Sequence, residues 1–295
     1  GTVYGSVGDT LDPTSGSSGA TLLANLSRLC TLTSLRADGT LEPSAASEWS
    51  SDVGAKTWTF KLRLDVTFHS GKSLTADDVI ATIARHTGEN SKSPFKAYVK
   101  NIAEMRKDGD HVVVIELLNG NADFPYLLSA SQMGILPSQD GSVDATTTDG
   151  AGAFVIEEFD PGVVVKFRRN ESYFGTAPHL DSAEVVTIRD AAARQAALLT
   201  GAVDVIDKVN TLTANRLEAK SGIQLLNIPS TLHYNFAMNT DLAPFDNNDV
   251  RLALKYSVNR EELLQKVLNG YGTLGNDQPI SPAYKYFNSE LPQRS

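Results

Sequence analysis

The sequence predicts an α/β fold in which helices cover mixed β-sheets. Some segments space their apolar residues as a helix does, and others alternate them as a half-buried strand does. From residue 183 onward, strand-like and helix-like segments alternate, which is typical of a mixed or parallel sheet covered by helices. The chain has 295 residues, of which 41% are hydrophobic and 21% charged. That composition is ordinary for a globular protein, and the length suggests about two domains.

The first part of the chain predicts strands and helices in turn. A short strand over residues 2–6 leads into a turn at Asp12 and Pro13 and a small polar stretch. Residues 20–32 then have helical spacing, and the Ser/Gly loop before them fits either an anion site or a simple helix start. Residues 58–63 alternate as a strand, and residues 111–117 form an apolar run that indicates burial on both faces. Between them, Thr75 and Asp78 form a capping box that opens a helix.

The second part begins with a hairpin, in which strands 153–159 and 163–169 flank the turn sequence DPG at residues 160–162. Helices are then predicted over residues 191–200 and 211–219, and a long helix over residues 248–269 is closed by Gly270. Further strands are predicted at residues 183–189, 203–209, 223–228 and 233–238. After Gly270 the chain is rich in glycine and proline and has the pattern of a loop.

Charge and motif content exclude several classes of function. The net charge of −9 argues against a nucleic-acid binder, and no apolar run reaches the roughly 18 residues that span a bilayer. The single cysteine, Cys30, lies in an apolar run and is expected to be a buried thiol. The five histidines form no metal-binding pattern, and neither a nucleophile elbow nor a phosphate loop is present. We therefore expect no catalytic residues, no metal and no cofactor.

Several segments, in order, resemble one family of transport receptors. They are LDP at residues 11–13, DGTLEPSAASEW at 38–49, WTFKLR at 58–63 with VTFHSGKSLTADDV at 66–79, DGAGAF at 149–154, RNESYF at 169–174, and Asn239 with PF at 244–245 and DVRLAL at 249–254. Together they are similar to the peptide-, opine- and nickel-binding solute-binding proteins of ABC importers, known as family 5. The most specific segment, residues 58–79, is expected to build core and cap a helix and not to contact ligand.

The resemblance implies a periplasmic-binding-protein-like fold of type II, cluster C, with two lobes that close on a ligand about a hinge. Residues 1–36 and 150–270 would form the core of lobe I, and residues 37–149 an extra subdomain inserted in it. Residues 271–295 would be the hinge crossover and the start of lobe II, because family members are longer and the rest of that lobe is absent from this sequence.

The same resemblance implies a monomeric, non-enzymatic receptor. It would be periplasmic or lipid-anchored outside the cytoplasm, and would deliver a peptide, opine or similar small molecule to a membrane ABC permease. An alternative is a binding module of the same fold with a sensing or chaperone role, which a linked transporter gene would distinguish. A third hypothesis, a carboxylate-dependent hydrolase, would need paired acidic residues at one site, and no motif in the sequence indicates such a pair.

Ligand contacts are expected in loops that line the cleft between the lobes. By the family's layout, the loop after Pro13 reaches this cleft, segment 93–98 often supplies an aromatic wall, residues 131–133 precede a strand facing the cleft, and two glycines bring backbone close. The candidates are Ser15, Gly16, Ser17, Ser18, Gly19, Phe95, Tyr98, Gln132, Met133, Gly150 and Gly152, with His233 and Tyr234 near the crossover. For each of them, packing or solvent exposure is the alternative.

Overall fold

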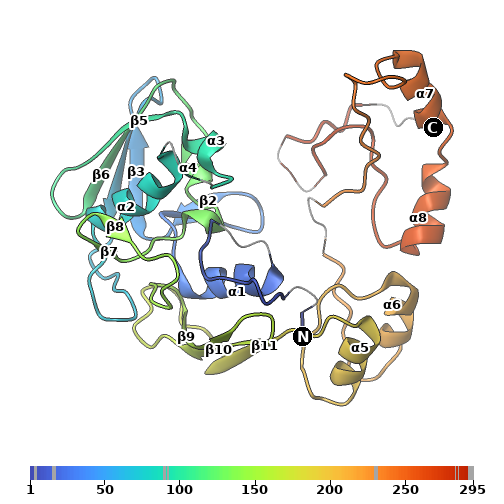
Figure 1. Cartoon of the computed structure of the whole chain (residues 1–295), viewed down its shortest axis with the longest axis horizontal. Helices are drawn as coiled ribbons and strands as arrows, with labels where there is room; N and C mark the ends of the chain where they lie inside the picture. Colours follow the sequence, from blue (N-terminus) through green and yellow to red (C-terminus); the bar gives the residue numbers. More distant parts are fainter. Residues whose placement is uncertain are drawn as a thin grey trace. The chain divides into compact units, whose positions relative to one another are not determined.

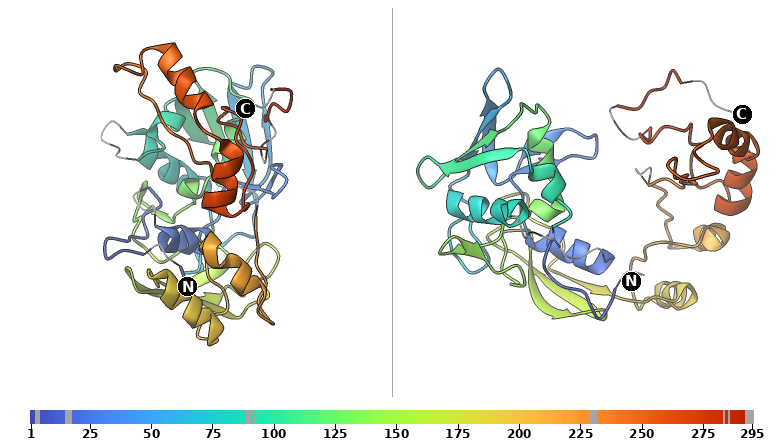
Figure 2. Two further views of the ribbon diagram at one scale, coloured as in Figure 1. Left: turned by 90° about the vertical axis from the view of Figure 1, so that its right-hand side faces the viewer. Right: turned by 45° about the horizontal axis from the view of Figure 1, so that its top comes forward.

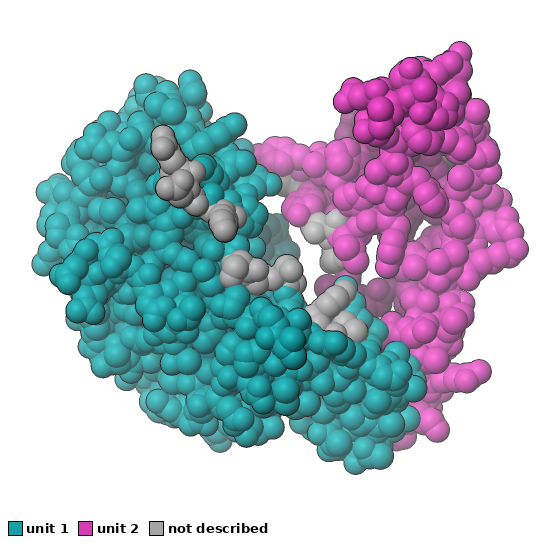
Figure 3. Space-filling view, in the orientation of Figure 1, with its two compact units in different colours: residues 1–208 teal, residues 209–295 magenta. Residues whose placement is uncertain are grey.

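The computed structural model describes residues 1–2, 5–14, 18–88, 91, 93–228, 232–282, 284 and 286–291. The chain divides into two compact units, residues 1–208 and residues 209–295, which are coloured separately in Figure 3. The division falls inside the predicted segment 150–270, and the lobe boundaries stay a prediction.

The larger core of the first unit lies between an antiparallel four-stranded sheet and helix α2 (Figure 1). Trp58, Phe60 and Leu62 alternate along one strand and are buried together with Val66 and Phe68, as their spacing predicts. The elements are β3 Ala46–Ser51, β4 Thr57–Leu62, β6 Val112–Leu117 and β5 Ile102–Lys107, in that order across the sheet, and α2 Ala76–Thr87. The core-building role predicted for segment 58–68 is confirmed.

The start of α2 is held by one buried carboxylate. Asp78 is fully buried and accepts a hydrogen bond from the Thr75 backbone N–H at 2.9 Å, which confirms its predicted capping role. The same carboxylate accepts from the backbone N–H of Ser138 at 2.7 Å and from its hydroxyl at 2.8 Å, and it pairs with Lys72. Asp78 therefore joins a helix start to a loop 60 residues further along the chain.

A second core lies between helix α1, Gly19–Arg28, and an antiparallel three-stranded sheet. Figure 2 shows α1 beside this sheet, and it contacts the two hairpin strands. The strands are β9 Phe154–Asp160, β10 Val164–Arg169 and β11 Ser182–Val186, with β10 in the middle. The hairpin is confirmed, and its turn places Gly162 at φ +75°, a conformation that glycine adopts without strain.

Of the four leucines whose spacing predicts α1, three do not form its buried face. Leu22, Leu23 and Leu26 are exposed, and only Leu29, the C-cap residue, is buried. The residues that face the protein are small or polar: Ala20, Thr21, Ala24, Asn25 and Arg28. Just beyond the helix, Cys30 is buried in the larger core, as predicted, and burial raises the pKa of its thiol to about 12.

Short elements complete the first unit. Two small antiparallel ladders pair β1 with β2 and β7 with β8, and Thr2 forms a parallel bridge with Thr187. The bounds are β1 Thr33–Leu35, β2 Leu41–Pro43, β7 Ser138–Gln139, β8 Ser142–Val143, α3 Lys96–Val99, α4 Phe124–Leu127, the 3₁₀ helix η1 Ser131–Met133 and α5 Ala191–Leu199. The strand predicted over residues 2–6 includes residues 3–4, which lie outside the described part of the chain.

The second unit is helical where it has regular structure. Its helices are α6 Thr211–Glu218, α7 Asn248–Tyr256 and α8 Arg260–Leu268. In the described part of this unit, Ala214 and Leu217 are the buried apolar residues. No described helix of the chain is long and apolar enough to cross a bilayer.

Several predictions for residues 203–269 are wrong. Residues 203–209, 223–228 and 233–238 form no strands, because a strand needs a neighbouring strand to pair its backbone groups and these segments have none in the described structure. The single helix predicted over residues 248–269 is two helices. Their break has a local cause, because the Asn259 side chain accepts from the Glu262 backbone N–H at 2.9 Å and so caps a new helix.

Candidate ligand-binding site

Three of the predicted ligand residues are linked to one histidine at the end of α2: Phe95 and Gln132 contact it, and Tyr98 packs on Phe95. His86 is 1% exposed, and its Nδ1 lies 2.7 Å from the Ser93 hydroxyl oxygen. The ring also hydrogen-bonds the backbone carbonyl of Gln132. Burial, followed by the positive charge of Arg85, lowers the pKa of His86 to about 4, so the ring is neutral at neutral pH.

Phe95 and Tyr98 extend outward from this histidine. The ring of Phe95 meets that of His86 edge-on, with centroids 6.1 Å apart. The ring of Tyr98 lies 5.2 Å from that of Phe95, and its side chain is 58% exposed. The three rings therefore run from the buried end of α2 to the surface, and Tyr98 is the accessible end.

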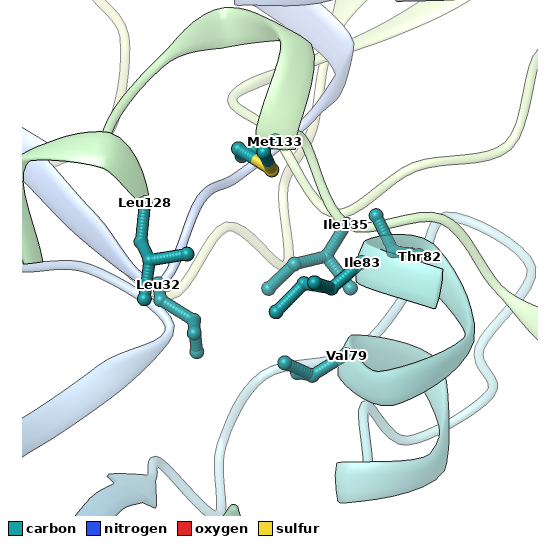
Figure 4. A pocket seen from close by; sticks show the side chains of 7 residues that line it. All are labelled: Leu32, Val79, Thr82, Ile83, Leu128, Met133 and Ile135. Atoms are coloured by element: carbon teal, nitrogen blue, oxygen red, sulfur yellow. The ribbon is translucent and has the colours of Figure 1, made fainter. Parts of the chain in front are cut away.

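Gln132 and Met133 belong to η1. Gln132 is partly buried and offers its backbone carbonyl to the histidine. Met133 is buried, and its side chain closes an apolar pocket together with α2 and the residues that follow α4 (Figure 4). That pocket has no space for a water-sized molecule, so Met133 acts there as packing. It is lined by Leu32, Val79, Thr82, Ile83, Leu128, Met133 and Ile135.

The loop before α1 is only partly described. Ser15, Gly16 and Ser17 lie outside the described residues. Ser18 is the N-cap of α1, and its hydroxyl oxygen accepts from the Thr21 backbone N–H at 3.1 Å. Gly19 is the first residue of the helix. Ser18 and Gly19 thus form an ordinary helix start, and the anion site stays a prediction.

Gly150 and Gly152 lie against the end of α1. Both are buried. A Cβ at Gly150 would come within 2.1 Å of the Arg28 carbonyl oxygen, and a Cβ at Gly152 within 2.4 Å of that of Ser27. The backbone of these glycines therefore does approach another group closely, but in this structure that group is the backbone of α1.

The same contact buries a positive charge. Arg28 is fully buried and donates to the Leu11 carbonyl at 2.7 Å, to the Asp149 carbonyl at 2.9 Å and to the Asn25 side chain at 3.1 Å. Burial lowers the pKa of its guanidinium to about 10, against the opposing pull of nearby carboxylates such as Asp149. Arg28 ties three segments together and has its charge satisfied inside the protein.

His233 and Tyr234 belong to the second unit, whereas all the other described candidates belong to the first. Both are exposed, and the Tyr234 side chain is 82% exposed. Their role as ligand contacts stays a prediction.

Sequence reasoning did not single out His86. A signal was available, because Val79, Ile83 and His86 follow one another at helical spacing and all three are buried on one face of α2. Among the described residues, no group of three or more His, Cys, Asp or Glu side chains could hold a metal ion.

Comparison with known proteins identifies the family. The model of bacterial extracellular solute-binding proteins, family 5, matches residues 40–295. The chain belongs to this family. Two curated relatives are the heme-binding protein A of Haemophilus influenzae and the dipeptide-binding protein of Escherichia coli. They are 28% and 26% identical over 277 and 283 residues, which are 85% and 86% of this chain.

The chain spans about half the length of these relatives, 50% and 52%. Among solved structures it is similar to an oligopeptide-binding protein of Bacillus subtilis, with a TM-score of 0.80, and to an agropinic-acid-bound protein of Agrobacterium tumefaciens, with a TM-score of 0.81. Each is 24% identical, and 99% of this chain covers 61% and 60% of them. These likenesses confirm the predicted periplasmic-binding-protein-like α/β fold, of which this chain covers mainly one lobe. The relatives are named as binding proteins.

Proposed function

We propose that this protein is an extracytoplasmic receptor that delivers a peptide-like or other small polar ligand to an ABC importer. The observation that supports the proposal most directly is the match of the family 5 model over residues 40–295. A location in the periplasm or at a lipid anchor, a membrane permease as partner and a monomeric state belong to the same proposal. Relatives named as periplasmic proteins support the location.

The site around His86 suggests how the first unit would contact such a ligand. Its accessible surface includes two aromatic rings, with Tyr98 outermost and Phe95 behind it. Arg85, which precedes His86, pairs with Asp12 at 2.9 Å, whereas Lys96 and Lys100 flank Tyr98 in the sequence. Contact would come from aromatic packing and from hydrogen bonds, which strengthen once water is excluded. A peptide segment with an apolar side chain fits this wall.

The ligands named for similar structures define the probes. They are the dipeptide Met-Leu, the peptide Ser-Thr-Ser-Ala and the complex Ni(L-His). Native mass spectrometry of the protein purified from its host would first identify any molecule it retains. Isothermal titration with each of the three probes would then measure affinity. A bound small polar molecule, or saturable binding of a probe, is the expected result.

Variants locate the binding surface. Tyr98→Ala should weaken binding by about 5- to 30-fold, as the loss of one aromatic contact of about 1–2 kcal/mol predicts. Tyr126→Ala, at another partly exposed tyrosine of the first unit, is the matched control and should leave affinity unchanged. A protein that retains nothing and binds no probe would refute the proposal. If the protein binds a ligand but uptake of that ligand does not depend on an ABC permease, the sensing or chaperone role would be favoured.

A further inference from the structure

His86 connects residues 93–98, in which Phe95 and Tyr98 form the candidate aromatic wall, to the turn that contains Gln132. Its Nδ1 meets the Ser93 hydroxyl, and its ring meets the Gln132 carbonyl. Ser93 in turn accepts a hydrogen bond from the Phe95 backbone N–H at 3.1 Å, and the Phe95 carbonyl accepts from the Tyr98 N–H at 2.9 Å. The position of Tyr98 therefore depends, through these bonds, on a histidine that is itself shielded from water.

The proton arrangement follows from the partners. A backbone carbonyl can only accept, so the imidazole donates its proton to Gln132. A neutral ring has one N–H, and its Nδ1 is therefore the acceptor of the Ser93 hydroxyl proton. Protonation would give Nδ1 a hydrogen of its own and turn an acceptor into a donor. The Ser93 hydroxyl proton would then have no acceptor at this position.

The surroundings oppose a charge on His86. The charged groups that act on it are Arg85, the preceding residue of α2, and Asp12 of the N-terminal segment. These two form an ion pair with each other at 2.9 Å, so the carboxylate is already engaged by the guanidinium. Phe95 and the pairing partners Ser93 and Gln132 are uncharged. No carboxylate is free to balance an imidazolium in this contact set.

We propose that neutral His86 is a positioning residue that holds the Phe95–Tyr98 wall against the Gln132 turn, and that its protonation releases the wall. The inference rests on the proposed function, since it assigns a role to the ligand-facing surface of the same site. His86 itself touches no ligand in this scheme. Acid would lower ligand affinity by loosening residues 93–98 while leaving the rest of α2 folded.

The expected size follows from linkage. The held state has a histidine pKa of about 4, and a released histidine has the ordinary value of about 6.5. Because the pKa is lower in the held state, the contribution of His86 to holding residues 93–98 is fully present above about pH 6.5. It is lost as pH falls toward 4. Between pH 7.5 and pH 5, the equilibrium for holding should fall by about 30-fold.

Amide hydrogen exchange of the whole chain tests this without any ligand, so its failure is separate from a failure of the proposed function. The protection of residues 93–99, corrected for the intrinsic pH dependence of exchange, should fall by about 30-fold between pH 7.5 and pH 5. Residues 79–85 of α2 should change by less than about twofold over the same range. Unchanged protection of residues 93–99 would overturn the proposal.

Variants separate titration from simple packing. His86→Gln keeps one donor and one acceptor but cannot titrate, so it should retain protection at pH 7.5 and lose the acid response. His86→Leu removes both hydrogen bonds and should show low protection at both pH values. His179→Gln, at an exposed histidine, should behave as wild type. An acid response in His86→Gln equal to that of wild type would refute the assignment.

A direct titration covers the case in which a variant fails to fold. Exchange of the histidine C2 proton in the wild-type protein reports the pKa of each histidine separately. A value for His86 below about 5 supports the proposal. An ordinary value for His86 would overturn it.

Discussion

Removal of the Asp78 carboxylate should cost more stability than any other single change to a surface loop or helix cap in the first unit. The side chain is fully buried and accepts five hydrogen bonds: two from the Thr75 backbone N–H and hydroxyl, two from the Ser138 backbone N–H and hydroxyl, and one from the Lys72 ammonium. The contact with Lys72 is also an ion pair. Asp78→Ala leaves two partly buried backbone N–H groups, those of Thr75 and Ser138, without this acceptor and removes a helix cap.

The magnitude follows from these losses. A lost cap costs about 1 kcal/mol, and each buried donor left unsatisfied costs about 1–3 kcal/mol. The sum of one lost cap and two unsatisfied donors is about 3–7 kcal/mol, a large part of the 5–15 kcal/mol by which a typical domain is stable. The adjacent Asp77 is the matched control, because it pairs with Lys107 at 2.6 Å on the exposed side of the helix. Asp77→Ala should cost less than about 1 kcal/mol.

Urea unfolding followed by tryptophan fluorescence measures both variants. The two tryptophans, Trp49 and Trp58, lie in neighbouring strands of the sheet that α2 covers, so their emission reports the affected core. A free energy of unfolding equal for Asp78→Ala and Asp77→Ala would refute the reasoning, because buried and exposed carboxylates would then contribute alike.

The effect should also depend on pH. Burial by itself would raise the pKa of Asp78, but the hydrogen bonds from Lys72, Ser138 and Thr75 together bring that pKa below its ordinary value. An aspartate whose pKa is lowered by folding contributes its full stability above the unfolded value of about 3.9, and loses it as pH falls through the folded value. The difference in free energy of unfolding between wild type and Asp78→Asn should therefore become smaller below about pH 4.

Two further predictions concern the junction at the end of α1. Gly152→Ala should lower the free energy of unfolding by about 2 kcal/mol or more, because the new Cβ would lie 2.4 Å from the Ser27 carbonyl oxygen. Gly88→Ala is the control, because nothing lies within 4 Å of a Cβ at that position. It should leave the free energy of unfolding nearly unchanged in the same urea assay. The thiol of Cys30, buried and with its pKa raised to about 12, should react with a disulfide reagent only as the first unit unfolds, and rapid labelling of the folded protein at pH 8 would contradict the burial.

The sequence predicted structure well where the signal is local. In the capping box at Thr75 and in the DPG turn at residues 160–162, the backbone hydrogen-bonding groups find partners only a few residues away. It failed at residues 203–209, 223–228 and 233–238, where β-like composition does not supply a neighbouring strand. The sequence also predicted α7 and α8 as one helix, because the helical spacing of apolar residues continues across Asn259, which caps α8.

Helix α1 shows why its buried face could not be predicted. Leu22, Leu23 and Leu26 have the spacing of a core stripe, yet they are exposed. Arg28 occupies the buried face instead, because its guanidinium reaches carbonyl groups of residues 11 and 149. Those acceptors are 17 and 121 residues away in sequence, and no window of sequence contains them all.

The sequence by itself determined the family, the fold class, the buried cysteine and the structural role of segment 58–79, because these depend on ordered motifs and on local periodicity. Only the tertiary structure decided that Phe95 and Gln132 meet at His86, with Tyr98 packed on Phe95. The physical reason is that a histidine's partners are set by packing between segments distant along the chain. A hydrogen bond such as that from His86 to Gln132 exists only once α2 and η1 lie together.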